Sequence, residues 1–166
     1  GGDDWRLSSA NVDFNLCPTY PRRFVVPAII DDAAIHSIAA FRSRGRIPAT
    51  TYRYAPSGAT ISRCAQPMVG LVRRARCRED EALLRALRNG SREEVYIIDC
   101  RSQAAALGNL AAGRGFEFSA HYGGSKLLFK NIDNIHAMRD SCKRLFELGR
   151  SISGQFDAQS RWLSHL

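Results

Sequence analysis

Cys17 and Arg23 are separated by five residues in the stretch LCPTYPRRF. A cysteine and an arginine at this spacing can cleave a phosphate ester, because the thiolate attacks phosphorus while the guanidinium grips the phosphate oxygens. That chemistry also needs a loop whose backbone N–H groups surround the phosphate and which opens directly into a helix. Cys17 is therefore a candidate nucleophile only if residues 17–23 form such a loop.

The sequence around Cys17 does not suit a phosphate-binding loop. Pro18 and Pro21 lack the N–H groups that the loop needs, and no glycine between Cys17 and Arg23 lets the backbone close around an anion. The residues that follow, FVVPAII, are β-like rather than helical. We therefore predict that Cys17 has a structural role, in an extended lead-in to a first strand.

Better placed polar side chains follow two predicted strands. Asp99 ends the run EVYIID, with Asn109 ten residues later, and Asn134 and Ile135 follow the run KLLFKNID. In open parallel sheets, sites form at the carboxyl ends of strands, where the next helix begins. A plain helix cap is the alternative role for Asn134, and a strand-end carboxylate bonded to the backbone is the alternative for Asp99. The residue chemistry leaves both alternatives open.

Alternating strands and helices must position these residues. The alternation predicts one α/β domain over residues 1–166, with a mixed or largely parallel sheet flanked by helices. Apolar periodicity, turn residues and caps give the element positions. We expect strands at 23–30, 94–99 and 126–133, a hairpin of 49–54 with 59–64, and helices at 31–45, 79–90, 102–115 and 134–149.

Three details of these elements are specific enough to check. Asp31, Ser102 and Asn134 are predicted caps, and the strand 94–99 is expected to be buried. Residues 155–166 are typical of the opening of an amphipathic helix that stops in the middle of its apolar stripe. We therefore expect the natural chain to continue beyond Leu166.

Composition narrows the class of protein. The apolar content of 45% and charged content of 24% are ordinary for a soluble domain, and no apolar run approaches the roughly 20 residues of a membrane span. The N-terminal segment is polar, so no signal peptide is expected. The five cysteines do not have the spacing of metal ligands or of a disulfide framework. We therefore expect neither a metal site nor another cofactor. Free thiols favour a reducing, cytoplasmic compartment.

The net charge of +8 indicates an anionic partner. Arginine supplies 21 of the 24 basic residues, and it gathers in two clusters, at 42–46 and 73–78. Nucleic acid, an anionic membrane surface and a phosphorylated substrate are all compatible with this charge. A solvated loop is the alternative interpretation of the second cluster. Nucleic acid is the weakest of these partners, because no interleaved aromatic platform or known motif accompanies the charge.

Several long segments together resemble one family. In sequence order they are WRLSSANVDFNLCPTYPRRFVVPAIIDD, FRSRGRIPA, ISRCAQPMVG, EVYIIDCRSQAAALGN with the following GRGFE, and NIDNIHAMRDSCKRL. They are similar to the N-terminal half of the catalytic domain of myotubularin-type phosphoinositide 3-phosphatases. The resemblance covers essentially the whole chain, and FRSRGRIP and NIHAMRDS are its most specific pieces.

The resemblance implies a cysteine-phosphatase-like fold, incomplete in this chain, and a lipid substrate in membranes. That substrate is phosphatidylinositol 3-phosphate or the 3,5-bisphosphate, which loses its 3-phosphate through a phosphocysteine intermediate. Asn109, Asn134 and Ile135 match positions that line the head-group pocket, and Asp99 matches a pocket aspartate. The family's nucleophile loop has no counterpart among these residues, so the resemblance implies that this chain alone is inactive.

The residues of this sequence are compatible with two functions and do not distinguish between them. One is part of an active lipid phosphatase, and the other is a catalytically dead scaffold or phosphoinositide-binding subunit. A homo-oligomer or a hetero-oligomer with another family member is compatible with either function. The resemblance further implies a cytoplasmic location, peripheral to endosomal-type membranes.

Overall fold

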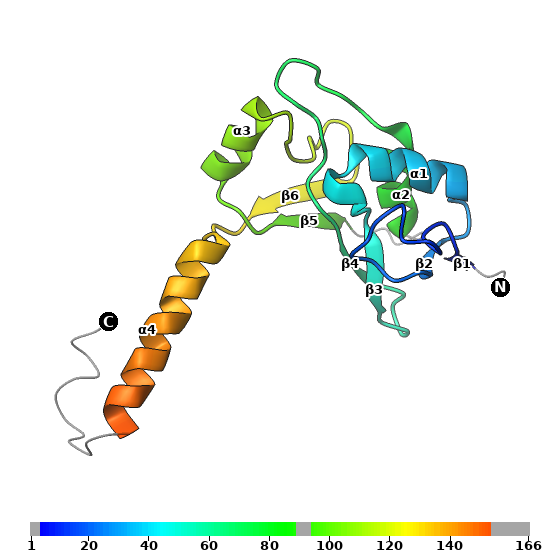
Figure 1. The fold of residues 1–166 in the computed structure, drawn as a ribbon. Coiled ribbons are helices and arrows are strands. Elements are labelled where there is room, and N and C mark those ends of the chain that lie inside the picture. Colours follow the sequence, from blue (N-terminus) through cyan, green and yellow to red (C-terminus); the bar gives the residue numbers. More distant parts are fainter. Residues whose placement is uncertain (1–3, 89–93, 154–166) are drawn as a thin grey trace. The chain divides into compact units, whose positions relative to one another are not determined.

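A computed structural model of the chain describes residues 4–88 and 94–153 (Figure 1). They belong to two compact units, which divide between Lys130 and Asn131 and are described here one at a time. The described elements are, in chain order, β1 (Trp5–Ser8), β2 (Phe24–Pro27), α1 (Asp32–Phe41), the 3₁₀ turn η1 (Ser43–Gly45), β3 (Ala49–Arg53), β4 (Thr60–Arg63), α2 (Arg78–Leu87), β5 (Val95–Asp99), α3 (Gln103–Ala111), β6 (Ser125–Phe129) and α4 (Ile135–Ser153).

The strands of the first unit form three separate pairs. β1 pairs with β2 and β3 with β4, both antiparallel, whereas β5 and β6 are parallel. The α/β class and the 49–64 hairpin are confirmed. A single, largely parallel sheet is not what the described residues form. A parallel pair needs a long crossover, and of the three strand pairs among the described residues only β5 and β6 are joined by a segment that contains a helix, α3.

The strand β5 is less buried than its apolar sequence predicts. Its side chains alternate, and Tyr96 and Ile98 on one face are each 57% exposed. The opposite face of the β5–β6 pair packs on a cluster that includes Leu110 and Phe116. The prediction of a buried strand is therefore wrong, because one face of β5 is exposed and the residues on the other face are only partly buried.

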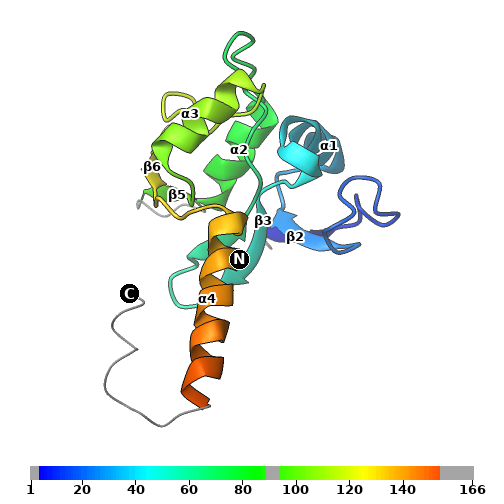
Figure 2. The ribbon, with the colours of Figure 1, turned by 60° about the vertical axis from the view of Figure 1, so that its left-hand side comes forward.

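Helix α1 begins where its cap predicts. The carboxylate of Asp31 accepts a hydrogen bond from the backbone N–H of Ala34 at 2.7 Å, and Ile35 and Ile38 are fully buried. They pack in the core of the unit with residues of β2 and α2. Figure 2 shows α1 and α2 next to each other in this part of the molecule. Helix α1 ends at Phe41, earlier than predicted.

Gly45 explains why the helix cannot continue to residue 45. It belongs to the separate turn η1 and has a φ of +66°, in the left-handed region. A Cβ atom at this position would lie 2.1 Å from the carbonyl oxygen of Leu16. The turn thus packs backbone against backbone, which only glycine allows here.

Helix α3 follows β5 and contributes two side chains to a second cluster of buried apolar residues, separate from the core around α1. The buried members of this cluster are Val69, Ala106, Leu110 and Phe116. Ser102 caps the helix through a hydrogen bond from the backbone N–H of Ala105 at 3.2 Å, as predicted. Ala106 and Leu110 are buried and contact Phe116, and the partly buried Phe129 of β6 joins this cluster. The helix stops at Ala111, so the glycines at 113 and 115 lie beyond it.

The described part of the second unit consists of residues 131–153, with α4 as its helix. Asn134 caps α4, since its side-chain oxygen accepts hydrogen bonds from the backbone N–H groups of His136 at 2.9 Å and Ala137 at 3.2 Å. The apolar stripe predicted for this helix is exposed, and its members are Ile135, Met138, Cys142, Leu145 and Phe146. The segment 155–166 lies outside the described residues.

Among the described residues, no helix combines the length and the apolar character needed to span a membrane.

Candidate functional site

Asp99 lies at the carboxyl end of β5, where the sequence predicted a site. Both oxygens of its carboxylate accept hydrogen bonds from the Arg101 guanidinium, Oδ1 from Nε at 3.0 Å and Oδ2 from Nη2 at 2.6 Å. The backbone N–H of Arg101 also donates to Oδ1 at 2.9 Å. The aspartate is therefore a fixed, charge-paired group rather than a free acid or base.

Arg101 is the residue that the sequence interpretation missed at this edge. Its side chain also donates to the Gln66 side-chain oxygen and, at 3.0 Å, to the carbonyl oxygen of Gly115. It thereby joins the end of β5 to the segment before Gly70 and to the segment after α3. The signal that could have revealed it is a basic residue two positions after a strand-end aspartate.

Asn109 occupies the last turns of α3 in the same unit. Its side-chain NH₂ donates to the carbonyl oxygen of Ala105 at 2.8 Å, one helical turn earlier. The amide oxygen accepts no hydrogen bond from any residue in the described ranges. Asn109 is partly exposed, so this oxygen can accept a hydrogen bond from a hydroxyl group of a ligand.

Asn134 and Ile135 belong to the second unit, whereas Asp99 and Asn109 belong to the first. The cap geometry of Asn134 uses its side-chain oxygen and leaves its NH₂ group as a donor. Ile135 is 67% exposed at the first position of α4. The structural role of Asn134 as a cap is thus established, while the convergence of the four residues on one pocket stays a prediction.

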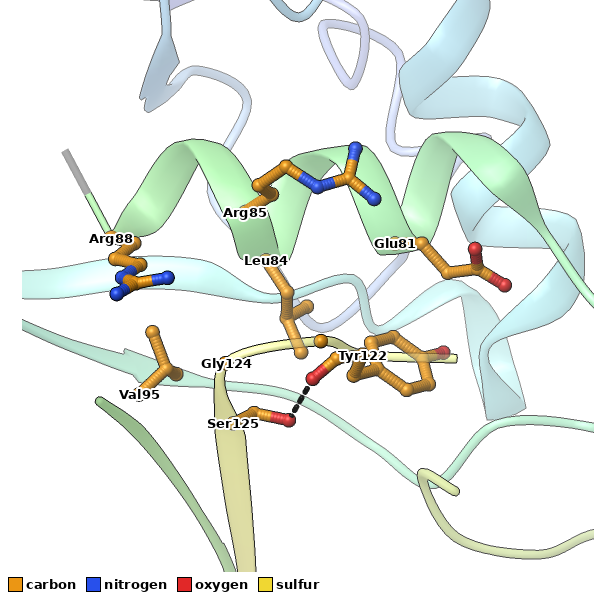
Figure 3. Close-up of a pocket in the computed structure, with 9 residues that line it drawn as sticks. Glu81, Leu84, Arg85, Arg88, Val95, Tyr122, Gly124 and Ser125 are labelled. Carbon is orange, nitrogen blue, oxygen red and sulfur yellow. Dashed lines mark hydrogen bonds between the residues drawn. The ribbon is translucent and has the colours of Figure 1, made fainter. Parts of the chain in front are cut away.

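A small pocket lies at the opposite end of the β5–β6 pair (Figure 3). Val95 and Ser125, the first residues of the two strands, line it together with Glu81, Leu84, Arg85, Arg88, Tyr122, Gly123 and Gly124. Its volume of about 10 Å³ is near the room that a single water needs. Asp99 lies four positions after Val95, about 13 Å along the strand. The pocket is therefore not the predicted site.

The first basic cluster, 42–46, contains a buried arginine. Arg42 is 1% exposed and forms two hydrogen bonds with Asp80, from Nε to Oδ1 at 2.8 Å and from Nη2 to Oδ2 at 2.6 Å. It also pairs with Glu117 and donates to the carbonyl oxygen of Ala65 at 3.0 Å. Burial alone lowers the pKa of Arg42, but the charge and hydrogen bonds of Asp80 and the charge of Glu117 outweigh it and raise that pKa.

Tyr122 completes this buried network. Its hydroxyl donates to Oδ2 of Asp80 at 2.7 Å. Burial, followed by the negative charge of Asp80, raises the pKa of Tyr122 well above its usual range, so the phenol stays a neutral donor. The network joins the residue after α1, the start of α2 and the segment between α3 and β6. Arg42 is therefore structural, not part of an exposed binding surface.

The second basic cluster, 73–78, lies mostly in contact with solvent. Arg73, Arg74, Arg76 and Arg78 are all exposed, in the segment that leads into α2. Arg76 alone of the four has a charged partner among the described residues, Glu81, with Nε 2.9 Å from Oε1. Three of its four arginines, Arg73, Arg74 and Arg78, therefore have no charged partner in the described ranges, whereas Arg42 of the first cluster is buried and paired.

Cys17 has the structural role that the sequence predicts. Its side chain is fully buried, and its backbone N–H donates to Oδ1 of Asn11 at 2.9 Å, within the protein rather than toward an anion. The side-chain NH₂ of Asn11 in turn donates to the Cys17 carbonyl oxygen at 3.0 Å. Arg23 is exposed. Residues 17–23 thus form a folded lead-in to β2.

Comparison with known proteins gives a single family over the whole chain. The model of the myotubularin-like phosphatase domain matches residues 1–166. Over 148 residues, or 88% of the chain, the sequence is 43% identical to a phosphatidylinositol-3,5-bisphosphate 3-phosphatase, MTMR2, of Pongo abelii, of which it covers 23%. It is 41% identical over 170 residues, 98% of the chain, to a myotubularin-related protein 9-like of Bos taurus, of which it covers 31%.

The sequence is about as similar to a plant protein as to these animal proteins. The chain is 40% identical over 168 residues, 97% of its length, to phosphatidylinositol-3-phosphatase myotubularin-1 of Arabidopsis thaliana, of which it covers 20%. The chain thus spans between a fifth and a third of the length of these relatives.

Proposed function

The chain belongs to the myotubularin-like phosphatase domain family, and from that premise we propose that it is part of a phosphoinositide 3-phosphatase. The reaction would remove the 3-phosphate of phosphatidylinositol 3-phosphate or of the 3,5-bisphosphate. One observation carries the proposal: the match extends over all 166 residues, and animal and plant relatives alike are named as 3-phosphatases of phosphatidylinositol lipids.

The proposed reaction proceeds in two displacement steps through a phosphocysteine. A thiolate attacks phosphorus, the bond from phosphorus to the inositol 3-oxygen breaks, and that oxygen takes a proton from a general acid and leaves as the hydroxyl. Water then attacks the phosphocysteine, which releases inorganic phosphate and restores the thiolate. The first step needs a thiolate as the nucleophile, and both steps need an arginine that holds the phosphate oxygens.

We propose that this thiolate comes from outside the 166 residues. Cys17 is the only one of the five cysteines with an arginine six positions later, and it is fully buried. Burial raises the pKa of the Cys77 thiol to about 11, which keeps it protonated near neutral pH. The chain alone is accordingly proposed to be inactive.

The proposed contribution of this chain is to hold the lipid head group. The free amide oxygen of Asn109 would accept a hydrogen bond from an inositol hydroxyl, and the NH₂ group of Asn134 would donate to a hydroxyl or phosphate oxygen. Ile135 would present its backbone N–H at the start of α4. Asp99, already paired with Arg101, would position the strand end rather than transfer protons.

Replacement of Asn134 tests the pocket in the natural protein that contains these residues. Asn134→Asp and Asn134→Ser retain a helix-capping oxygen but lose the NH₂ donor, and the aspartate adds a charge that repels phosphate. We expect kcat/KM for phosphate release from phosphatidylinositol 3-phosphate vesicles to fall about 10-fold to 100-fold, the equivalent of one hydrogen bond to a charged group.

Unchanged helicity by circular dichroism would show that the cap survives in both variants. Asn15→Ser, at an exposed asparagine, is the matched control and should retain wild-type kinetics. Wild-type kinetics in Asn134→Ser would reduce Asn134 to a helix cap. No phosphate release by the wild-type natural protein would contradict the proposed function itself.

A catalytically dead scaffold or phosphoinositide-binding subunit is the second proposed function. The observation that favours it is the Bos taurus relative, whose name states no enzymatic activity although it is as similar as the others. A protein of this kind would act through assembly with an active family member. Binding of phosphatidylinositol 3-phosphate without its hydrolysis would distinguish this function from the first.

Location follows from the same proposal. Five free cysteines among the described residues suit the reducing cytoplasm, and a phosphoinositide substrate requires a place at the surface of a membrane. We propose a cytoplasmic protein that is peripheral to endosomal-type membranes.

A further inference from the structure

Residues 70–76 form a turn that presents two aliphatic side chains to solvent, here called the 70–76 loop. Val72 is 93% exposed and Leu71 is 59% exposed, the former among the most exposed large apolar side chains described. Figure 2 shows this part of the chain, between β4 and α2, projecting beyond the helices. Neighbouring exposed aliphatic groups at the tip of a loop indicate a surface that an apolar partner covers.

Backbone hydrogen bonds hold the 70–76 loop against α3. The N–H of Leu71 donates to the carbonyl oxygen of Leu110, and that of Gly70 to the carbonyl oxygen of Arg114, both at 3.0 Å. The N–H of Ala75 closes the base of the loop on the carbonyl oxygen of Val69 at 2.9 Å. The tip is thus presented on a fixed base, and its first bond to α3 is one residue from Asn109.

Unpaired positive charge flanks the aliphatic tip. Arg73 and Arg74 are exposed, and neither makes an ion pair with another residue in the described ranges. Arg114, which follows α3, is also exposed. The first acidic residue that follows the tip is Glu79, in the first turn of α2. The tip therefore combines apolar side chains with basic ones and contains no acidic group.

We propose that the 70–76 loop is a membrane-docking element that enters an anionic lipid surface. Leu71 and Val72 would lie at the boundary between head groups and acyl chains, while Arg73 and Arg74 contact lipid phosphates. The choice of a lipid surface as occupant rests on the proposed phosphoinositide substrate and on the charge complementarity. Because the loop is bonded to α3, docking would bring Asn109 to the level of the head groups.

A protein partner suits the loop less well. Specific protein interfaces bury about 800 Å² on each side, with aromatic anchors at their centre. The 70–76 loop offers two aliphatic side chains and no aromatic one. Insertion into a lipid surface needs only a small apolar tip and nearby cationic groups.

Co-sedimentation of the 166-residue chain with vesicles tests the proposal without any phosphoinositide. Vesicles of phosphatidylcholine with about 30% phosphatidylserine, an anionic lipid of the cytoplasmic leaflet, are compared with vesicles of phosphatidylcholine alone. We expect Leu71→Ser/Val72→Ser to weaken binding to the anionic vesicles at least about 10-fold, because two aliphatic groups no longer leave water. Ile29→Ser, at another exposed aliphatic side chain, should leave the affinity unchanged.

The arginines and the aliphatic tip should respond differently to salt. Arg73→Gln/Arg74→Gln should weaken binding about 10-fold at low salt and much less at high salt, because screening removes the contribution of exposed charges. Arg53→Gln/Arg63→Gln, on the β3–β4 hairpin, removes the same charge elsewhere and should have a smaller effect. Val72→Trp should gain fluorescence quenching by brominated acyl chains, above the background from Trp5 and Trp162.

Three results would overturn the proposal: no binding of the wild-type chain to anionic vesicles, wild-type affinity in Leu71→Ser/Val72→Ser, or no quenching in Val72→Trp. Loss of self-association in Leu71→Ser/Val72→Ser, measured by analytical ultracentrifugation, together with wild-type vesicle binding, would assign the loop to a protein contact. Failure of the enzymatic proposal is a separate result, since it appears as absent phosphate release and leaves binding to these vesicles intact.

Discussion

Arg42→Gln should lower the free energy of unfolding by about 3–5 kcal/mol, the largest effect of any single substitution considered for the first unit. The arginine is fully buried and forms ion pairs with two buried carboxylates, those of Asp80 and Glu117. Glutamine removes the charge and the bidentate fork, and it leaves two like charges without compensation in a low-dielectric interior. The cost is therefore that of buried unpaired charge, well above the value of one hydrogen bond.

Urea denaturation of wild type and variants measures this prediction. Arg44→Gln, two residues away and exposed, is the matched control and should change the free energy of unfolding by less than about 0.5 kcal/mol. Arg42→Lys keeps the charge but not the fork, so its loss should be intermediate. Equal stabilities of Arg42→Gln and Arg44→Gln would contradict the account of the buried network.

Gly45→Ala should also be strongly destabilising, by about 3 kcal/mol. Two physical terms add at this position. An alanine with a φ of +66° is strained, at a cost of about 1–2 kcal/mol, and its Cβ would lie 2.1 Å from the Leu16 carbonyl oxygen, which forces the backbone of the lead-in segment to move. The displaced backbone belongs to the residue before Cys17, so the fold of residues 16–24 should loosen as well.

Gly113→Ala separates the two terms. Gly113 has a similar φ of +75°, but a Cβ there meets no atom within 4 Å, so this variant should show the strain alone, about 1–2 kcal/mol. The difference between the two variants then measures the clash with Leu16. Identical losses in urea denaturation would mean that the segment before Cys17 yields without cost, and the proposed backbone packing would be wrong.

Local signals in the sequence predicted local structure. Asp31, Ser102 and Asn134 cap helices as expected, because a cap depends only on its own side chain and the next three residues. The hairpin of β3 and β4 was predicted from the turn residues between two β-like runs. Strand β1 was not predicted, because it has four residues and pairs with a strand 16 positions away.

Long-range relations could not be predicted from the sequence. The basic segment FRSRGRIP gave no indication that Arg42 is buried, since its two acidic partners lie 38 and 75 residues further along the chain. Nor did the pattern EVYIID show that one face of β5 would be exposed, because burial depends on what covers the sheet. Both properties arise from packing between segments that are distant in sequence.

For the candidate site, too, local backbone structure was predicted from the sequence and side-chain contacts were not. The run EVYIID correctly predicted a strand that ends at Asp99, but it did not reveal the pairing with Arg101. The rule that sites follow strand ends drew attention to Asn109, Asn134 and Ile135, but chemistry alone could not distinguish them from ordinary helix residues. The family resemblance, confirmed by the match over residues 1–166, is what implied a head-group role for them. A shared role of these residues in a head-group pocket is part of the proposed function. The variants Asn134→Asp and Asn134→Ser test that role for Asn134.

The central claim is that these residues serve a phosphocysteine enzyme whose nucleophile lies outside them. The most direct test treats the natural protein with phosphatidylinositol 3-phosphate that carries a radioactive 3-phosphate, denatures it within milliseconds and locates the labelled peptide by mass spectrometry. We predict a label on a cysteine other than Cys17, Cys64, Cys77, Cys100 and Cys142. A label on any of these five cysteines, or release of phosphate without a labelled cysteine, would contradict the account.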